Sequence, residues 1–275
     1  MGLKKFLVKP PDTPSRGKAK FRRGNPVRRP VQLFMPQELE KVKQHQSRGW
    51  HWVSPGWFFH PSSLGEECDR ALLLGMAGLR APVTDRLIRI WDEGKCMHFR
   101  WTGYFRETGQ LIRADVPVKN LTYLVQGTAD LLITLASGDP GLGEMKSIKD
   151  NRCARLPSPS EDPRENIEAL LAVDHRSVVV QWTVYAAELA PRGFILFENK
   201  DTQEPLWYPM QVIDFILLPI RERFLKLKPK IQAHLIPAIF DDIQRCLKCD
   251  LQPVCSQMPQ GEHPFQKITL PGEET

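Results

Sequence analysis

The chain has 275 residues, of which 41% are hydrophobic and 25% are charged, and this composition is sufficient for a folded core. No apolar run approaches the roughly 18 residues that a membrane-spanning helix needs. The N-terminal segment lacks the apolar stretch and small-residue cleavage site of a secretory signal. These features argue against a membrane protein and predict an intracellular one, cytoplasmic or associated with the nucleoid.

Residues 1–36 are expected to form a basic, proline-rich, flexible tail. Residues 1–30 contain ten lysines and arginines against the single Asp12, so the formal net charge of +6 comes from this segment and the remaining chain is mildly acidic. Five prolines occur here without helical or strand periodicity. Clustered cations gain affinity for nucleic acid through counterion release, which favours a phosphate-binding arm. A solubilising tail, or one that docks on a protein partner, is the alternative.

The rest of the chain alternates between helical and strand patterns. Residues 50–59 are dense in aromatic side chains, for which core or lid packing is favoured over stacking on unpaired bases. Residues 137–141, Ser-Gly-Asp-Pro-Gly, have the composition of a turn that connects hairpin strands. In chain order the expected elements are helix 36–46, helix 62–76 with Cys68 inside it, helix 85–105, strands 111–118, 121–126, 128–135 and 142–148, helix 164–172, helix 176–189, strands 193–199 and 205–210, and helix 211–228.

Strands framed by helices on both sides in sequence are typical of an α/β domain. We therefore expect residues 37–275 to form one such domain, with a mixed central sheet flanked by helices.

Two neighbouring expected strands carry acidic residues that suit a metal site. Asp130 follows Gly127 on one strand, and Glu144 and Lys146 lie on the next, where alternation places them on the same face. Two adjacent carboxylates repel each other unless a cation lies between them, so a hard divalent ion such as magnesium or manganese is the natural partner. Such an ion polarises a phosphate, and Lys146 could orient or deprotonate an attacking water. A solvated strand face is the alternative.

Three further residues extend this set. His98 lies on the apolar face of helix 85–105, one turn beyond Gly94; alone, it is more typical of a hydrogen-bonded core histidine than of a metal ligand. Gln181 and Tyr185 are four residues apart and share a face of helix 176–189. They could bind phosphate or fix Lys146, or they could simply pack.

The four pairs Gly94/His98, Gly127/Asp130, Glu144/Lys146 and Gln181/Tyr185, in this order, resemble the RecB-type branch of the PD-(D/E)XK nuclease superfamily. The resemblance covers about residues 60–256 and implies a restriction-endonuclease-like core. It implies that His98, Asp130 and Glu144 bind the metal ion, that Lys146 is the catalytic lysine, and that Gln181 and Tyr185 complete the site.

The cysteines form a second constellation. Cys246, Cys249 and Cys255 are a compact trio in segment 246–255, and Cys68 lies far upstream. Spacing alone suits structural zinc and an iron–sulfur cluster equally. The sequence resembles the iron–sulfur-containing subset of the family, which includes CRISPR-associated RecB-like exonucleases and has one cysteine before the nuclease core and three after it. That resemblance implies a 4Fe–4S cluster tying the N- and C-terminal segments together, with structural zinc as the alternative.

The resemblance implies a metal-dependent DNase, in the first place an exonuclease that prefers single-stranded DNA or DNA ends and acts in recombination, replication or end processing. A structure-specific endonuclease subunit of a larger complex is one alternative. A non-catalytic nucleic-acid-binding or assembly subunit that keeps the fold is another. The chain has no Gly-x4-Gly-Lys-Ser/Thr motif, so unwinding would need a helicase or other processing protein as a partner.

Overall fold

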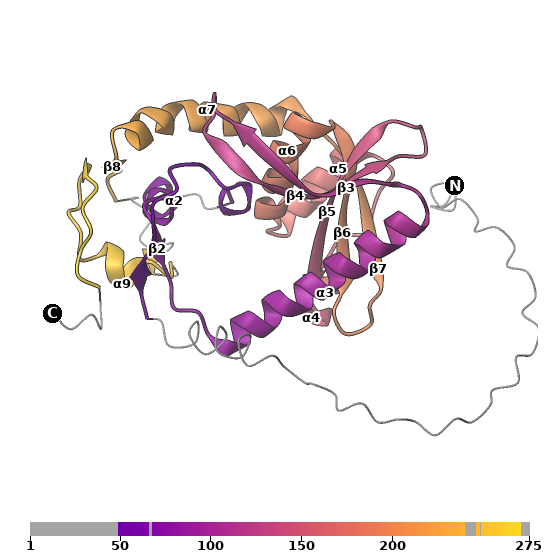
Figure 1. Ribbon diagram of the computed structural model, residues 1–275, viewed down its shortest axis with the longest axis horizontal. Coiled ribbons are helices and arrows are strands. Elements are labelled where there is room, and N and C mark those ends of the chain that lie inside the picture. The colour runs from indigo at the N-terminus through magenta and orange to yellow at the C-terminus, as the bar shows by residue number, and fades with distance from the viewer. Residues whose placement is uncertain (1–48, 66–67, 240–245, 248, 271–275) are drawn as a thin grey trace, which may run out of the picture. The chain divides into compact units, whose positions relative to one another are not determined.

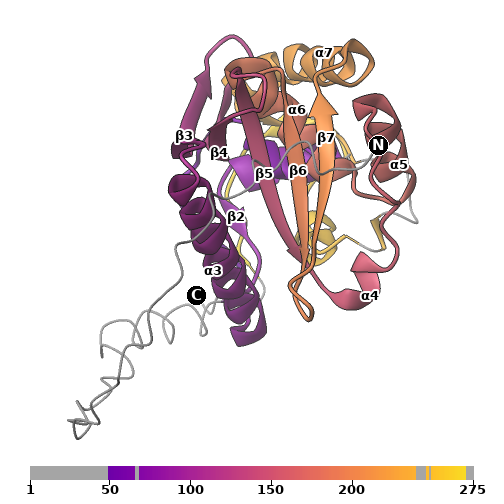
Figure 2. The same cartoon turned by 90° about the vertical axis from the view of Figure 1, so that its right-hand side faces the viewer.

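A five-stranded mixed sheet forms the centre of the computed structural model (Figure 1). The structure describes residues 49–65, 68–239, 246, 247 and 249–270. The strands of this sheet are β3 (Leu111–Asn120), β4 (Val125–Thr134), β5 (Pro140–Ile148), β6 (Arg192–Asn199) and β7 (Pro205–Gln211). Figure 2 shows them side by side in the order β3-β4-β5-β6-β7.

Strand direction in the sheet follows from the connections. The pairs β3–β4, β4–β5 and β6–β7 are antiparallel and are joined by short turns. The pair β5–β6 is parallel and therefore needs a long crossover. The crossover contains α4 (Asp150–Cys153), α5 (Pro163–Ala172) and α6 (Arg176–Leu189).

Helices cover both faces of the sheet. On one face α3 (Asp85–Glu107) contributes Met97 and Phe105 to a buried cluster with Leu131, Met145 and Leu196. On the other face α5 and α6 contribute the members of a second cluster, which include Ile167, Leu170, Val179 and Trp182, packed on Ala129, Leu142 and Ile195. Figure 1 shows α3 along one side of the sheet and α6 on the other. The mixed sheet with helices on both faces confirms the expected α/β architecture.

A third cluster joins segments from the two ends of the described chain. It contains Phe59, Leu73 of α2 (Asp69–Met76), Phe224 and Leu227 of α7 (Asp214–Gln232), and Val254. Nearby are the 3-10 turn η2 (Pro61–Ser63), the ladder β1 (His51–Trp52) with β2 (Leu79–Arg80), the ladder β8 (Leu235–Ile236) with β9 (His263–Pro264), and α9 (Gln252–Cys255).

Most expected elements agree with the structure, with two corrections. The expected strands 121–126 and 128–135 are one strand, β4, because the β3–β4 ladder continues through Val118↔Gly127 and Pro117↔Thr128. The expected helix 62–76 is also wrong at its start. Cys68 has an extended backbone and caps α2 from outside the helix, where its Sγ accepts from Ala71 N at 3.5 Å.

The aromatic segment packs against the third cluster, with Phe59 buried and Trp50, Trp52 and Trp57 partly buried, in agreement with the packing interpretation. The Trp57 ring stacks on His234 with ring centroids 4.5 Å apart. The Trp52 indole donates to the backbone oxygen of Ile268 at 3.2 Å. Phe59 is fully buried.

All described residues belong to one compact unit, His45–Thr275. The expected tail at residues 1–36 and the expected helix 36–46 lie outside the described residues. None of the helices in the described part of the chain is long and apolar enough to cross a membrane.

Candidate active site

The candidate active site lies where β4 and β5 separate. Their antiparallel ladder ends at the pair Leu131↔Gly143, and the preceding residue of β4 is Asp130. The backbone N–H of Met145 donates to Asp130 Oδ2 at 2.8 Å. A side-chain carboxylate thus takes the place of a ladder hydrogen bond, so the two strands are joined at this point while their backbones diverge.

His98 on α3 binds the other backbone group of Met145. Its Nε2 lies 3.1 Å from the Met145 carbonyl oxygen. Because a carbonyl can only accept, this contact assigns a proton to Nε2, so a lone pair for a metal ion would have to come from Nδ1. Nδ1 lies 3.7 Å from Asp130 Oδ1. A histidine that donates one nitrogen to a carbonyl and presents the other is in the form that binds metal ions.

Glu144 and Lys146 project from the same face of β5, as their alternation predicts. Glu144 has an exposed fraction of 0%, and Lys146 Nζ lies 2.6 Å from Glu144 Oε1. The same ammonium donates to Gln181 Oε1 at 3.1 Å, which ties α6 to the strand. Glu144 Oε2 has no hydrogen-bond partner within the described residues.

Tyr185 packs against β4 at a position that only glycine fits. The Tyr185 hydroxyl accepts the Thr128 N–H at 3.1 Å. A Cβ atom on Gly127 would lie 2.3 Å from this hydroxyl oxygen, well inside van der Waals contact. Gly127 therefore allows the phenol to lie directly on the strand that carries Asp130.

The charges of the cluster perturb one another. Burial, together with the nearby Asp130, raises the pKa of Glu144 from 4.5 to about 8, although Lys146 opposes the shift. Burial lowers the pKa of Lys146, but Glu144 and Asp130 outweigh it, so the net shift is upward and the ammonium stays protonated. Burial and the same two carboxylates raise the pKa of Tyr185, which remains a phenol.

These residues fit a hard divalent cation by their chemistry. In the described part of the chain, no three or more histidine, cysteine, aspartate or glutamate side chains are already arranged as a metal site. Nevertheless Asp130 and Glu144 carry carboxylate oxygens, and Glu144 Oε2 is buried without a hydrogen-bond donor. Lys146 contacts Oε1 and does not offset the burial, because the pKa of Glu144 stays raised, so a divalent cation at Oε2 would stabilise the ionised carboxylate. His98, Asp130 and Glu144 are the side chains that would hold such an ion.

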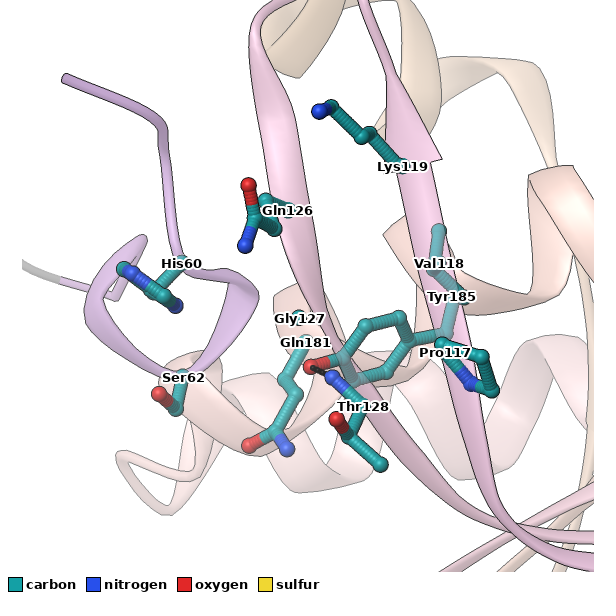
Figure 3. Close-up of a pocket in the computed structure, with 10 residues that line it drawn as sticks. All are labelled: His60, Ser62, Pro117, Val118, Lys119, Gln126, Gly127, Thr128, Gln181 and Tyr185. Carbon is teal, nitrogen blue, oxygen red and sulfur yellow. Dashed lines mark hydrogen bonds between the residues drawn. The ribbon is translucent and has the colours of Figure 1, made fainter. Parts of the chain in front are cut away.

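A pocket of about 490 Å³ adjoins this cluster and contains residues that the sequence did not reveal. Gln181 and Tyr185 line it together with His60 and Lys119, among others (Figure 3). No spacing or motif marks His60 or Lys119. Their proximity to the site depends on contacts between segments that are far apart in sequence.

The described residues do not show the expected four-cysteine cluster, but one contact joins the regions of two of its members. Arg70, two residues after Cys68, donates from Nε to Cys255 Sγ at 3.1 Å. The Cys249 N–H donates to the Cys246 carbonyl at 3.2 Å, so these two residues share a turn. One hydrogen bond therefore links the region of Cys68 to Cys255, and the four-thiolate cluster itself stays a prediction.

No family model matches the sequence, and no curated protein matches it. Among solved structures, the chain is similar to one described as the crystal structure of SSO0001, with 14% sequence identity and a TM-score of 0.43. The similarity covers 80% of this chain and 93% of that chain. A similarity at this level supports no inference about function.

Proposed function

We propose that the chain is a divalent-metal-dependent nuclease that hydrolyses the phosphodiester bonds of DNA. The observation that carries the proposal is the buried Glu144 carboxylate, which lies beside Asp130 and is paired with Lys146 on one strand face. Once Glu144 is ionised, as binding of a cation would favour, Asp130 and Glu144 bear two negative charges and Lys146 one positive charge. A divalent cation would make the cluster net positive, and this matches a phosphate anion.

The protein's own residues supply positioning and hydrogen-bond donors. A bound magnesium or manganese ion would contribute Lewis acidity toward a phosphate oxygen. Lys146 is held between Glu144 and Gln181 by 2.6 and 3.1 Å contacts, so its ammonium is placed to donate to a phosphate oxygen or to orient an attacking water. Tyr185 accepts from Thr128 and keeps its own proton for donation.

The same proposal includes the finer points that the resemblance implies. The core would be of the restriction-endonuclease-like kind, and the enzyme would be an exonuclease acting on single-stranded DNA or DNA ends. Cys68, Cys246, Cys249 and Cys255 would hold a 4Fe–4S cluster, with zinc as the alternative. The Arg70–Cys255 contact supports a link between the two ends, because Arg70 is buried and also donates to the backbone oxygens of Pro237 and Pro259.

The test is a nuclease assay on end-labelled linear and circular DNA, single- and double-stranded, with magnesium, manganese or EDTA. Glu144→Gln keeps the side-chain shape but removes the charge, so we expect activity to fall by at least about a hundredfold. Glu204→Gln, an exposed change in the β6–β7 turn, is the matched control and should cut like the parent.

Loss of linear but not circular substrate would identify an exonuclease, and cleavage of circles an endonuclease. If Glu144→Gln cuts as fast as the parent, the site is elsewhere. If the folded parent cuts none of the substrates with either metal while still binding DNA, the non-catalytic binding subunit becomes the better description.

A further inference from the structure

The pocket beside Gln181 and Tyr185 has walls from three separate parts of the chain (Figure 3). One wall is the segment around η2, the second is the β3–β4 hairpin, and α6 contributes the third. The residues that line the pocket are His60, Ser62, Pro117, Val118, Lys119, Gln126, Gly127, Thr128, Gln181 and Tyr185.

Backbone hydrogen bonds fix the first wall against the second. Phe59 N donates to Leu124 O at 2.7 Å, and Gln126 N donates to Phe59 O at 2.9 Å. This short parallel bridge, anchored by the fully buried Phe59 ring, places His60 opposite Gln126. The pocket is thus built into the fold and does not depend on the rotamer of one surface side chain.

The lining is free of carboxylates although the neighbouring cluster contains two. Among the ten lining residues, none is aspartate or glutamate, and hydroxyl, amide and ammonium donors predominate. Lys119 provides the positive charge. Its Nζ lies 5.2 Å from the centre of the Phe58 ring, and it forms no ion pair with a described carboxylate.

Two further groups favour an anion. Gln181 Oε1 accepts from Lys146, so the Gln181 amide nitrogen is left as a donor on a side chain that is 8% exposed. Burial and the charge of Arg80 lower the pKa of His60, so its imidazole is neutral at neutral pH and serves as a hydrogen-bond partner. Arg80 adds a second positive charge near this wall.

We propose that this pocket is a phosphate-binding subsite for the nucleotide next to the scissile phosphate, with Lys119 contacting the phosphate and Gln126, Ser62 and Gln181 donating to its oxygens or to the sugar. This inference rests on the proposed function, because it uses the adjoining cluster to locate the scissile phosphate. The volume of about 490 Å³ suits a ligand of that size. Gln181 would contact Lys146 on one side and the bound DNA on the other.

The test measures binding without catalysis, so that its failure differs from failure of the nuclease assay. Fluorescence anisotropy of a short labelled oligothymidylate is recorded in EDTA over a range of salt concentrations. The variants are Lys119→Ala, Gln126→Glu and the matched controls Lys226→Ala and Gln232→Glu, which make the same charge changes at exposed positions of α7. Oligonucleotides with hydroxyl or phosphate ends, and inorganic phosphate as a competitor, distinguish an internal phosphodiester from a terminal phosphate.

We expect Lys119→Ala to weaken binding about fivefold at low salt and to reduce the salt slope by about 0.7, the value for one phosphate contact to a single strand. Gln126→Glu should weaken binding further, because it places a carboxylate in the pocket, and both controls should bind like the parent. If Lys119→Ala loses affinity only for oligonucleotides with phosphorylated ends, the pocket binds a terminal phosphate. If Lys119→Ala and Lys226→Ala bind alike, or if Gln126→Glu binds like the parent, the subsite does not exist, whether or not the enzyme cuts DNA.

Discussion

The raised pKa of Glu144 predicts an unusual dependence of stability on pH in the metal-free protein. The free energy of unfolding should decrease as pH rises, because the folded state binds a proton at Glu144 that the unfolded chain has already released. The folded pKa is about 8 and the ordinary value is 4.5. At about 1.4 kcal/mol per pKa unit, this interval corresponds to about 5 kcal/mol. The loss should fall between about pH 4.5 and about pH 8, and be complete above it.

Glu144→Gln isolates this contribution. The variant cannot ionise at position 144, so the difference between its unfolding free energy and that of the parent should grow by up to about 5 kcal/mol across the same window. Lys146 loses Glu144 as a charged partner in the variant but keeps Gln181 Oε1 as an acceptor and the negative charge of Asp130 nearby. The assay is urea denaturation in EDTA at a series of pH values. If the unfolding free energies of the two proteins change with pH in parallel, the pKa of Glu144 is not raised in the folded state.

Magnesium provides the second half of the same experiment. A divalent cation binds the ionised carboxylate, so it should restore stability to the parent, more strongly at higher pH, and do little for Glu144→Gln. Equal stabilisation of both proteins by magnesium would place the ion away from Glu144.

Other parts of the structure give two further predictions. Gly127→Ala should destabilise the protein by about 2 kcal/mol, because its Cβ would lie 2.3 Å from the Tyr185 hydroxyl oxygen; adding Tyr185→Phe should recover part of that loss in urea denaturation, and strictly additive effects would contradict the contact. Cys249→Ser should lower bound iron per protein and the midpoint of thermal unfolding, whereas Cys153→Ser, at a cysteine outside the predicted ligand set, should change neither. Zinc in place of iron in the purified parent would select the alternative metal.

The sequence was sufficient to predict the order of elements and the identity of the acidic cluster, because both depend on local patterns. Alternation along β5 placed Glu144 and Lys146 on one face of that strand, and helical periodicity placed Gln181 and Tyr185 on one face of α6. The structure brings Lys146 to Gln181 and leaves the Tyr185 hydroxyl on Thr128.

What sequence patterns could not reveal depends on register and on contacts between distant segments. β4 and β5 separate at Asp130 because their ladder ends at the pair Leu131↔Gly143, and no alternation pattern in the sequence specifies where a ladder ends. The start of α2 was wrong because Cys68 caps the helix in place of extending it. The bridge between Phe59 and Val125 brings His60 to β4, and these two bridged residues are more than sixty positions apart in sequence.

The acidic character of the chain beyond its first residues is compatible with a nucleic-acid substrate because the charges are separated locally. Asp130 and Glu144 lie where β4 and β5 separate, and a divalent cation together with Lys146 would more than neutralise them. The adjoining pocket contains Lys119 and no carboxylate among its lining residues. Gln181 lies between the two regions, bound to Lys146 and lining the pocket. A phosphate chain that passes from one region to the other would therefore meet compensated or positive charge at each step, so local potential, and not net charge, decides whether the strand can bind here.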